Sequence, residues 1–290
     1  MKNCFVIAVT AALAFSSLSS ICQTTVDLGL PSGTLWASCN LGGTNAWDYG
    51  DYYAWGETSL HYSDLNIGSA VFTWKTGFED GFTWDTYKYA TNRYTGLTKY
   101  CSSAAYGKAG YTDALTSLQP VDDAALAVWG DDWVIPTYKE WSELSKNCYW
   151  EWTENYNSKG KKGYIVYKTK NDKDKGIKNI LYDQNRKLKY KTTESYSLSD
   201  THIFLPASGG CVGNSLSRRN SYGYYWTASL YNVSPCFARV VLFDNTSVSA
   251  CQFSYEITDL SDRSKKKTII ENDNISRRYD GQSIRPVKRP

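Results

Sequence analysis

The chain has 290 residues, and its 32 Lys and Arg against 29 Asp and Glu give a formal net charge of +3. This near balance excludes a dedicated nucleic-acid-binding protein, because such proteins usually carry a strongly basic face. The aromatic content is unusually high: Phe, Trp and Tyr make up 15% of the residues, with 11 Trp and 24 Tyr. Tyr and Trp bury a large apolar area and keep one polar group, which suits both cores and wet interfaces.

The N-terminal segment, residues 1–22, has the parts of a secretory signal peptide. A basic start (Met1–Asn3) precedes a mostly apolar run (Cys4–Phe15) and a small-residue segment (Ser16–Cys22). The apolar run is too short to span a bilayer, which takes about 20 residues. We therefore expect an exported protein, secreted or at the cell surface, that is cleaved after Cys22 and keeps residues 23–290 as one domain. Lipidation of Cys22 is the alternative that the sequence does not favour, because Ile21 stands where small residues are wanted. Membrane attachment is expected only if Cys22 is lipidated.

A hairpin followed by long loops is predicted at the start of the mature chain. Val26–Gly29 and Thr34–Leu41 are extended runs, and Pro31 and Gly33 between them favour a tight turn. Long ordered loops with short strands are expected in two aromatic-rich stretches that lack clear periodicity, residues 49–57 and 72–100.

Two helices are predicted, Asp122–Trp129 and Pro136–Leu144. The first opens with two acidic residues, which are favourable at the positive end of the helix dipole. In the second, Thr137 and Glu140 form a capping box, in which each side chain satisfies a backbone N–H of the first turn. Trp141 and the closing Leu lie three residues apart, so they are expected on one buried face.

Strands are predicted from residue 163 onward, because short apolar runs alternate there with turn residues. The four runs are Tyr164–Tyr167, His202–Leu205, Tyr224–Ser229 and Phe237–Phe243. A Lys-rich stretch at about 168–200 is expected to be an inserted hairpin with a solvated basic face, and an extended loop is expected at about 254–278. Two helices followed by a series of strands predict the α+β class.

Six cysteines follow the leader, and none of their spacings is the CxxC of a zinc or thioredoxin-like site. An exported chain with an even number of thiols permits disulfides, in many possible pairings. Free, buried thiols are the alternative, because Cys also packs as a small hydrophobe. The six are Cys39, Cys101, Cys148, Cys211, Cys236 and Cys251.

A series of short strings, in a fixed order, runs through essentially the whole mature chain. It consists of Val26–Leu30, Trp36–Asn40, Tyr53–Thr58, Asp122–Ala125, Trp129–Gly130, Trp133–Thr137, Phe204–Ala207, Tyr224–Ser229 and Gly281–Val287. Together these strings resemble the Fibrobacter succinogenes major paralogous domain, a family common in exported proteins of Bacteroides-like bacteria.

The resemblance implies a C-type-lectin-like fold, which two looser relatives share. One is the C-terminal domain of the Legionella collagen-like adhesin. The other is the formylglycine-generating sulfatase-modifying family, whose W-R-L-P-T-x-x-E-W string is similar to the residues from Trp133 to Trp141. The chain departs from its relatives at Val134, where they usually have Arg, and in the longer stretches 171–200 and 254–278. A ligand preference held in those loops is therefore not inherited.

The sequence offers few partners for catalysis. Gly209–Gly213 has the G-x-C-x-G spacing of a nucleophile elbow, but an elbow needs a strand, a turn and a helix, and no helical periodicity follows. His61 and His202 are the two histidines available as a base. Formylglycine chemistry needs a close cysteine pair, whereas Cys236 and Cys251 are separated and their surroundings do not match. The residues predict no enzymatic activity, no cofactor and no metal site, calcium included, because the E-P-N, Q-P-D and W-N-D strings of calcium lectins are missing.

Aromatic side chains gather in one Gly- and Ser-containing stretch, and they predict recognition of a glycan or an extracellular protein partner. Flat rings stack on sugar faces and anchor protein interfaces at low entropic cost. Tyr222, Tyr231 and Arg239 are expected to be exposed, whereas Trp226 is expected in the core, because alternation along a strand sends some rings inward. The candidate binding residues are Tyr222, Tyr224, Tyr225, Tyr231 and Arg239.

Further hypotheses stay open. The Lys-rich insertion binds an anionic polysaccharide through a salt-sensitive field, or it is only a solvated hairpin. Its candidate lysines are Lys161, Lys162, Lys173, Lys175, Lys187 and Lys189. Two alternatives to binding concern the whole protein. It is a structural surface or assembly component, or, as the less favoured alternative, an enzyme related to the sulfatase-modifying family.

Overall fold

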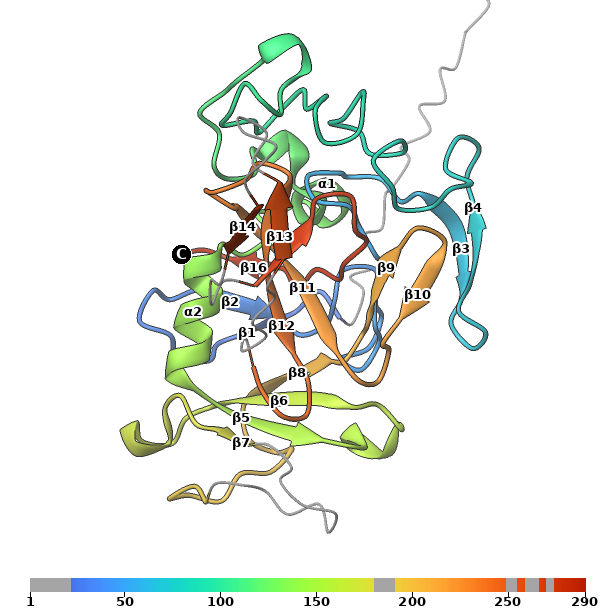
Figure 1. Ribbon diagram of the computed structural model, residues 1–290. Coiled ribbons are helices and arrows are strands. Elements are labelled where there is room, and N and C mark those ends of the chain that lie inside the picture. The colour runs from blue at the N-terminus through green and yellow to red at the C-terminus, as the bar shows by residue number, and fades with distance from the viewer. Residues whose placement is uncertain (1–21, 180–190, 249–254, 259–265, 270–273) are drawn as a thin grey trace, which may run out of the picture.

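The computed structural model describes residues 22–179, 191–248, 255–258, 266–269 and 274–290. Over these residues the chain forms small, mostly antiparallel sheets and two α-helices, joined by long loops (Figure 1). This arrangement confirms the predicted α+β class. Neither of the helices described has the length and apolar character needed to cross a bilayer. Of the predicted leader, residues 1–21 lie outside the described part of the chain.

The sheet at the centre of the fold is antiparallel and has the strand order β11-β12-β15. β11 (Gly223–Leu230) pairs with β12 (Phe237–Phe243), whose other edge pairs with the short β15 (Ile275–Arg277). Aromatic and β-branched residues face one another across this sheet, as Trp226 does opposite Val240, and such pairs stabilise strand pairing. The two strands predicted here are confirmed.

A four-stranded sheet with the order β7-β5-β6-β8 lies below the central sheet in Figure 1. Its strands are β5 (Cys148–Thr153), β6 (Gly163–Lys168), β7 (Lys178–Asn179) and β8 (His202–Pro206). Residues 163–167 of β6 are buried without interruption, because alternate side chains join two different hydrophobic clusters, one on each face. This covering of both faces explains why the β6 sequence is apolar throughout rather than alternating.

Three further hairpins surround these sheets. They are β3 (Tyr62–Asn66) with β4 (Val71–Trp74), β9 (Gly210–Val212) with β10 (Ser215–Ser217), and β13 (Tyr255–Thr258) with β14 (Lys266–Ile269). The expectation of one extended loop at 254–278 is wrong, because β13, β14 and β15 fall within it. The Ile- and Thr-containing runs there favour extended backbone.

The predicted N-terminal hairpin is confirmed, and the C-terminal end of the chain joins it. β1 (Thr25–Val26) pairs with β2 (Leu35–Ala37), which pairs in turn with β16 (Val287–Lys288). Gly33 adopts a φ of 74° and its N–H donates to the carbonyl of Leu30 at 2.9 Å. This left-handed conformation suits glycine, which explains the tight turn between the two runs.

Both predicted helices form, and both are capped as the sequence indicates. Asp123 accepts from two backbone N–H groups at the start of α1 (Ala124–Trp129), and Thr137 and Glu140 complete the capping box of α2 (Tyr138–Asn147). The buried face of α2 carries Trp141 and Leu144, as expected. This face packs against β5, β11 and β12, so α2 connects the two larger sheets.

Most of the unusual aromatic content lies in the core rather than on the surface. Fully buried rings include Trp36, Trp55, Trp141, Trp150, Trp226, Tyr52, Tyr87, Tyr100, Tyr149 and Tyr164. Many of them meet edge to face at 4.6–6 Å between ring centres, the geometry that aromatic pairs prefer. Most of the rings therefore stabilise the core of the fold, and only rings outside the core are available for binding.

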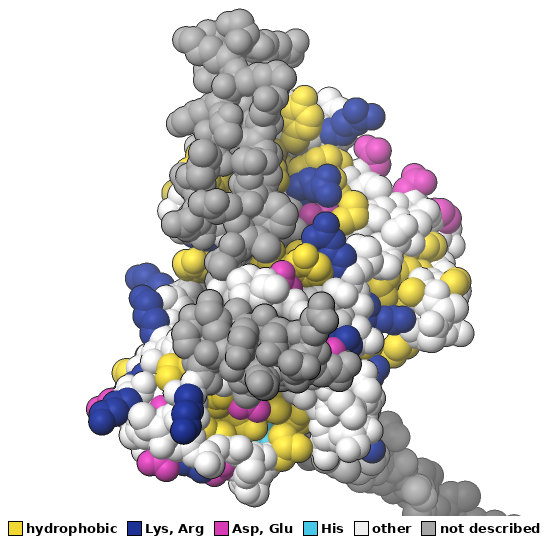
Figure 2. Space-filling view, turned by 60° about the horizontal axis from the view of Figure 1, so that its bottom comes forward, with side chains coloured by type: hydrophobic (Ala, Val, Ile, Leu, Met, Phe, Trp, Pro, Cys, Tyr) yellow, Lys and Arg dark blue, Asp and Glu magenta, His cyan; other side chains and the backbone are white. Residues whose placement is uncertain are grey.

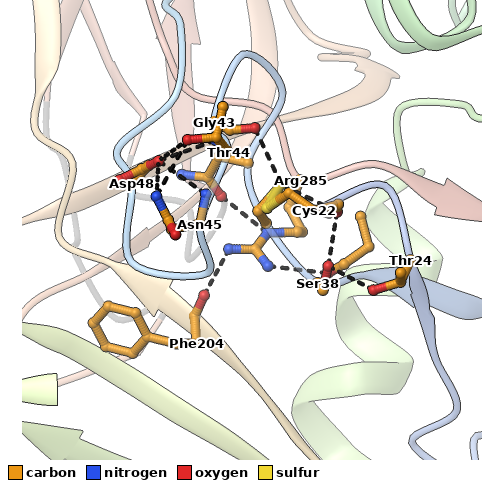
Figure 3. The surroundings of a disulfide bond; sticks show 12 residues. Cys22, Thr24, Ser38, Gly43, Thr44, Asn45, Asp48, Phe204 and Arg285 are labelled. Atoms are coloured by element: carbon orange, nitrogen blue, oxygen red, sulfur yellow. Dashed lines mark hydrogen bonds between the residues drawn. A yellow bond between two sulfur atoms is a disulfide. The ribbon is translucent and has the colours of Figure 1, made fainter. Parts of the chain in front are cut away.

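The first hairpin is closed by a disulfide between Cys22 and Cys39 (Figure 3). Cys22 is buried, and its carbonyl accepts a hydrogen bond from Ser38 Oγ at 2.7 Å. This bond conflicts with the assignment of Cys22 to the leader, since a chain cut after Cys22 has lost one of the two sulfurs. Among the cysteines described, the others are free and buried, which confirms the alternative for Cys101, Cys148, Cys211 and Cys236. Cys251 lies outside the described residues.

The Lys-rich stretch does not form a separate hairpin over the residues that the structure describes. Its β7 joins the four-stranded sheet, parallel to β5. Asp174, in the 3₁₀ turn Asp172–Asp174, accepts from the N–H and Oγ1 of Thr193 and from Tyr196 Oη, all at 2.8–2.9 Å. These bonds fix the two ends of the insertion to each other, whereas residues 180–190 lie outside the described part.

Candidate ligand pocket

A pocket of about 490 Å³ opens between the central sheet, the β9–β10 hairpin and the C-terminal segment. Gly210, Ser217 and Tyr224 line it from one side, and Val240 and Ile275 supply apolar wall. Its volume falls within the range of small-molecule sites, roughly 300–1,000 Å³. Apolar walls with a few well-placed polar groups are typical of such sites.

Two buried polar side chains line this pocket, Asp280 and Gln282, which are exposed by only 4% and 3%. Ser276 connects them: its Oγ donates to Asp280 Oδ2 at 2.7 Å and accepts from Gln282 Nε2 at 3.0 Å. The two remaining oxygens, Asp280 Oδ1 and Gln282 Oε1, accept no hydrogen bond from any residue that the structure describes. A buried acceptor without a donor costs roughly 1–3 kcal/mol. A hydroxyl or amine donor that reached these oxygens would remove this cost.

The charge in the pocket comes from Asp280 and from two exposed arginines, Arg277 and Arg218. Burial raises the pKa of the Asp280 carboxyl above its usual range, and the Arg277 charge and the hydrogen bond from Ser276 oppose this rise. Arg277 Nε lies 3.5 Å from the carboxylate. Asp280 is thus an acceptor whose charge changes at a higher pH than that of an ordinary Asp.

Gly210 makes room for the amide of Gln282. A Cβ at position 210 would overlap Gln282 Oε1. The backbone of Gln282 is fixed by paired hydrogen bonds with Tyr53, both at 3.1 Å. Because the backbone cannot yield, the amide reaches this position only when residue 210 has no side chain.

The connection between β10 and β11, residues 218–222, forms a polar ridge beside the pocket. Arg218 donates to Tyr224 Oη at 3.0 Å, and its guanidinium lies 4.9 Å from the ring centre of Tyr222. The two tyrosine rings stack with their centres 6.1 Å apart. Tyr224 lines the pocket, whereas Tyr222 lines a smaller hollow of about 140 Å³ together with Lys162 and Asn220.

Two of the predicted binding residues, Tyr222 and Tyr224, are therefore half-buried and line hollows, and a third is buried in the core. Tyr225 is fully buried, and its Oη donates to the carbonyl of Pro206 at 2.8 Å. It alternates with Tyr224 along β11 and so faces the opposite side of the strand. Trp226 is 1% exposed and donates to the carbonyl of Tyr53, which confirms its predicted place in the core.

The last two predicted residues lie away from the pocket. Tyr231 is 1% exposed, so its predicted exposure is wrong. Arg239 is half-buried, and its guanidinium lies 4.8 Å from the ring centre of Tyr138 and 5.7 Å from that of Tyr231. Arg239 precedes the pocket residue Val240 on β12, so alternation points it to the other face.

The G-x-C-x-G string does not form a nucleophile elbow. Cys211 lies on β9 and pairs with Leu216 of β10, so the string is part of a strand-turn-strand hairpin instead of a strand-turn-helix. Cys211 is fully buried, and burial raises the pKa of its thiol well above the usual range. The histidines are engaged elsewhere: His202 Nε2 contacts Tyr156 Oη at 2.9 Å, and His61 Nε2 contacts Glu57 Oε2 at 2.7 Å.

The candidate lysines do not form one basic field. Lys162 forms an ion pair with Glu154, and Lys175 pairs with Asp172 at 2.7 Å. Lys161 contacts the ring of Tyr49, and Lys173 lies in the 3₁₀ turn of the insertion. Figure 2 shows Lys and Arg side chains at separate places on one face, with Asp and Glu among them. Lys187 and Lys189 lie outside the described residues.

Sequence reasoning missed the polar groups of the pocket, Ser276, Asp280 and Gln282. Gln282 belongs to the C-terminal string that carried the resemblance, and Ser276 falls within the stretch taken as a loop. A usable signal was present: Asp280 and Gln282 flank Gly281 in a run in which polar residues are interspersed with Ile284 and Val287. Polar residues in such a buried run need partners, so they mark a site.

Within the described part of the chain, no three His, Cys, Asp or Glu side chains meet in a way that could hold a metal ion. No family model matches the chain, and no curated protein or solved structure matches it either. The resemblance to the major paralogous domain therefore stays a prediction.

Proposed function

We propose that this chain is an exported, non-catalytic protein that binds a hydroxyl-rich glycan in the pocket of Asp280 and Gln282. The observation that carries the proposal is the pair of buried acceptors, Asp280 Oδ1 and Gln282 Oε1, that receive no hydrogen bond from the described residues, in a pocket that Tyr224 also lines. Among these residues, Asp280 Oδ1 has only the ion pair with Arg277 Nε at 3.5 Å. Sugar hydroxyls are donors that satisfy such oxygens, and each bond to a charged acceptor is among the stronger kinds.

The apolar wall fits the same ligand class. Val240 and Ile275 offer surface to the C–H face of a sugar ring, and the half-buried ring of Tyr224 offers a flat face with a hydroxyl at its edge. A hollow of about 490 Å³ accommodates a small ring system, whereas a protein partner of standard size needs a broad contact area.

The proposal includes a C-type-lectin-like fold, which rests on the resemblance. It is supported by the positions of the matching strings, whose largest residues lie in the core: Trp36, Trp55, Trp226 and Arg285 are all buried. Export is supported by the leader-like composition of the first 22 residues.

Binding to an array of neutral oligosaccharides tests the pocket. Gln282→Met keeps the length of the side chain and removes its amide, so we expect about a tenfold loss of affinity for the bound glycan. Gly210→Ala should have a similar effect, because its methyl group displaces the Gln282 amide. The glycan should be recovered unchanged after incubation, as judged by its mass.

Gln119→Met is the matched control, because Gln119 is half-buried and does not line the pocket. Thermal unfolding of each variant separates lost binding from lost structure. Equal affinities for the unaltered protein and for Gln282→Met and Gly210→Ala would remove the pocket as the site, and a shortened glycan would show that the protein is an enzyme.

A further inference from the structure

A compact cationic cluster lies on two aromatic rings beside the ridge. Lys161 Nζ lies 4.1 Å from the ring centre of Tyr49, and Arg219 Cζ lies 5.4 Å from the same centre. Lys159 Nζ lies 5.1 Å from the ring centre of Trp47, which precedes Tyr49 by two residues. The β5–β6 turn and the ridge, which are distant in sequence, thus place Lys161 and Arg219 over the same ring. Lys159 lies over a second ring of the same loop.

No carboxylate among the described residues forms an ion pair with Lys161 or Arg219. Glu154, the acid nearest in sequence to Lys161, is paired with Lys162. Asp48 Oδ2 is already occupied by N–H groups of Thr44 and Asn45 at 2.9–3.0 Å. The two cations therefore lie together without the partner that usually accompanies them.

Two further features show that this arrangement is unfavourable by itself. Arg219 Nη1 is buried and donates no hydrogen bond to the residues described. The pKa of Lys161 is lowered, first by burial and then by the charge of Arg219, while Asp48 raises it. An anion at this position would satisfy the guanidinium and relieve the repulsion between the two charges.

We propose that Lys161 and Arg219, with Lys159, form a subsite for a carboxylate or sulfate group carried by an acidic polysaccharide. Arg219 follows Arg218 directly in the ridge, and Asn220 connects the subsite to the polar hollow by accepting from Tyr49 Oη at 2.7 Å. The inference goes beyond the proposed function, because it rests on different residues and gives the ligand a charge.

The surroundings favour an acidic polysaccharide over a nucleic acid. Lys161 and Arg219 meet over one ring and Lys159 lies over a second, whereas a nucleic-acid backbone is tracked by a stripe or face of many cations. The adjoining hollow is lined by Asn220 and Ser221, whose polar groups suit sugar hydroxyls. Its charged residues are Asp244 and the paired Lys162 and Glu154.

Affinities for heparin, which is sulfated, for alginate, which carries carboxylates, and for neutral dextran test the subsite. Lys161→Met and Arg219→Met keep the apolar stems over Tyr49 and remove the charge. We expect each to lower affinity for at least one acidic polymer about tenfold or more. Lys173→Met, which removes the same charge from the insertion, should change it less than about twofold.

Three results would overturn the subsite: equal losses in all three variants, tight binding of inorganic sulfate with no gain from the polymer, or tighter binding of single-stranded DNA than of either polysaccharide. The first would show diffuse attraction, the second a free-anion site, and the third a nucleic-acid ligand. Gln282→Met is included in the same assay. Loss of neutral-glycan binding in that variant alone, with acidic binding intact, keeps the two proposals separate.

Discussion

A buried arginine fastens three segments of this fold through neutral partners. Arg285 is fully buried and donates to Asn40 Oδ1 at 2.9 Å, to the carbonyl of Ala37 at 3.0 Å and to that of Phe204 at 2.6 Å (Figure 3). Burial lowers the pKa of Arg285 to about 10, so the side chain keeps its charge at neutral pH. Its planar fork suits several acceptors at once, which a lysine ammonium does not. Arg285 thus finds acceptors among buried neutral groups, whereas Asp280 Oδ1 and Gln282 Oε1 in the pocket accept no hydrogen bond from the described residues.

Glycan binding is expected to weaken in acid because of Asp280. Burial raises the pKa of this carboxyl, so protonation begins above the usual Asp range of about 4. The carboxylate accepts hydroxyl donors more strongly than the neutral acid does, so affinity should fall severalfold as pH falls through the raised pKa. Measuring the dissociation constant from about pH 7 to pH 4 tests this, and Asp280→Asn should flatten the profile.

Asp123→Asn is the control for the acid profile. Asp123 is another buried acid whose pKa burial raises, but it caps α1 and does not line the pocket. Its variant should keep the full pH dependence of binding. An unchanged acid limb in Asp280→Asn would contradict the role given to that carboxylate.

At the scale of elements, local chemistry made the helices predictable and tertiary context hid several strands. Asp123 and the capping box of α2 act within a few residues, so their sequence spacing is sufficient evidence. β5 was missed because it follows α2 without a turn residue, and β7 because its one partner is a parallel strand far away in sequence. Pairing of this kind leaves no local pattern to read.

The N-terminal hairpin is expected to depend on its disulfide. Cys22 and Cys39 are 17 residues apart, and a crosslink closing a loop of this length stabilises by about 3 kcal/mol. Urea unfolding of Cys39→Ala and of the Cys22→Ala, Cys39→Ala pair should show similar losses of that order. The paired variant also removes the unpartnered thiol that the single variant leaves.

Cys101→Ala is the comparison, because Cys101 is a free buried thiol and its loss should cost clearly less. Mass spectrometry of the protein isolated from its own cells and their medium, under non-reducing conditions, supplies the second measurement. We expect the mature chain to contain Cys22 joined to Cys39. A mature chain beginning at Gln23 would contradict this and would restore the cleavage site predicted from the sequence.

At the scale of the molecule, composition predicted the class of fold but not the use of its rings. Eleven Trp and 24 Tyr favour both a core and a binding face, and nothing in a strand sequence such as 222–231 says which side of the sheet will be covered. The structure assigns Tyr225, Trp226 and Tyr231 to the interior and leaves Tyr222 and Tyr224 at the hollows. The pocket itself is lined by separate segments between Gly210 and Gln282 that meet only through strand pairing, so its polar floor was beyond local reasoning.

This buried ring content predicts that the protein unfolds in alkali. Burial raises the pKa of many tyrosines, among them Tyr52, Tyr62, Tyr87, Tyr149, Tyr164 and Tyr225. The folded protein then holds protons that the unfolded chain has released, so the free energy of unfolding is full below about pH 10 and falls as pH rises further. For Tyr225, whose pKa is raised to about 12, the loss is on the order of 3 kcal/mol.

Buried thiols act in the same direction from about pH 9, since the pKa of Cys148 and that of Cys236 are each raised to about 12. Arg285, Lys161 and Lys178 act in the opposite direction, because burial lowers the pKa of each and so favours the folded state as pH rises through that lowered pKa, but they are few against many. Urea unfolding followed by tryptophan fluorescence between about pH 8 and pH 11 should therefore show a midpoint that is level at about pH 8 and falls above about pH 9. Tyr225→Phe keeps the ring and removes one ionisable group, so its stability should start lower, through the lost bond to Pro206, and fall less steeply. Constant stability to pH 11 would mean that these rings reach solvent, and the close-packed aromatic core described here would be wrong.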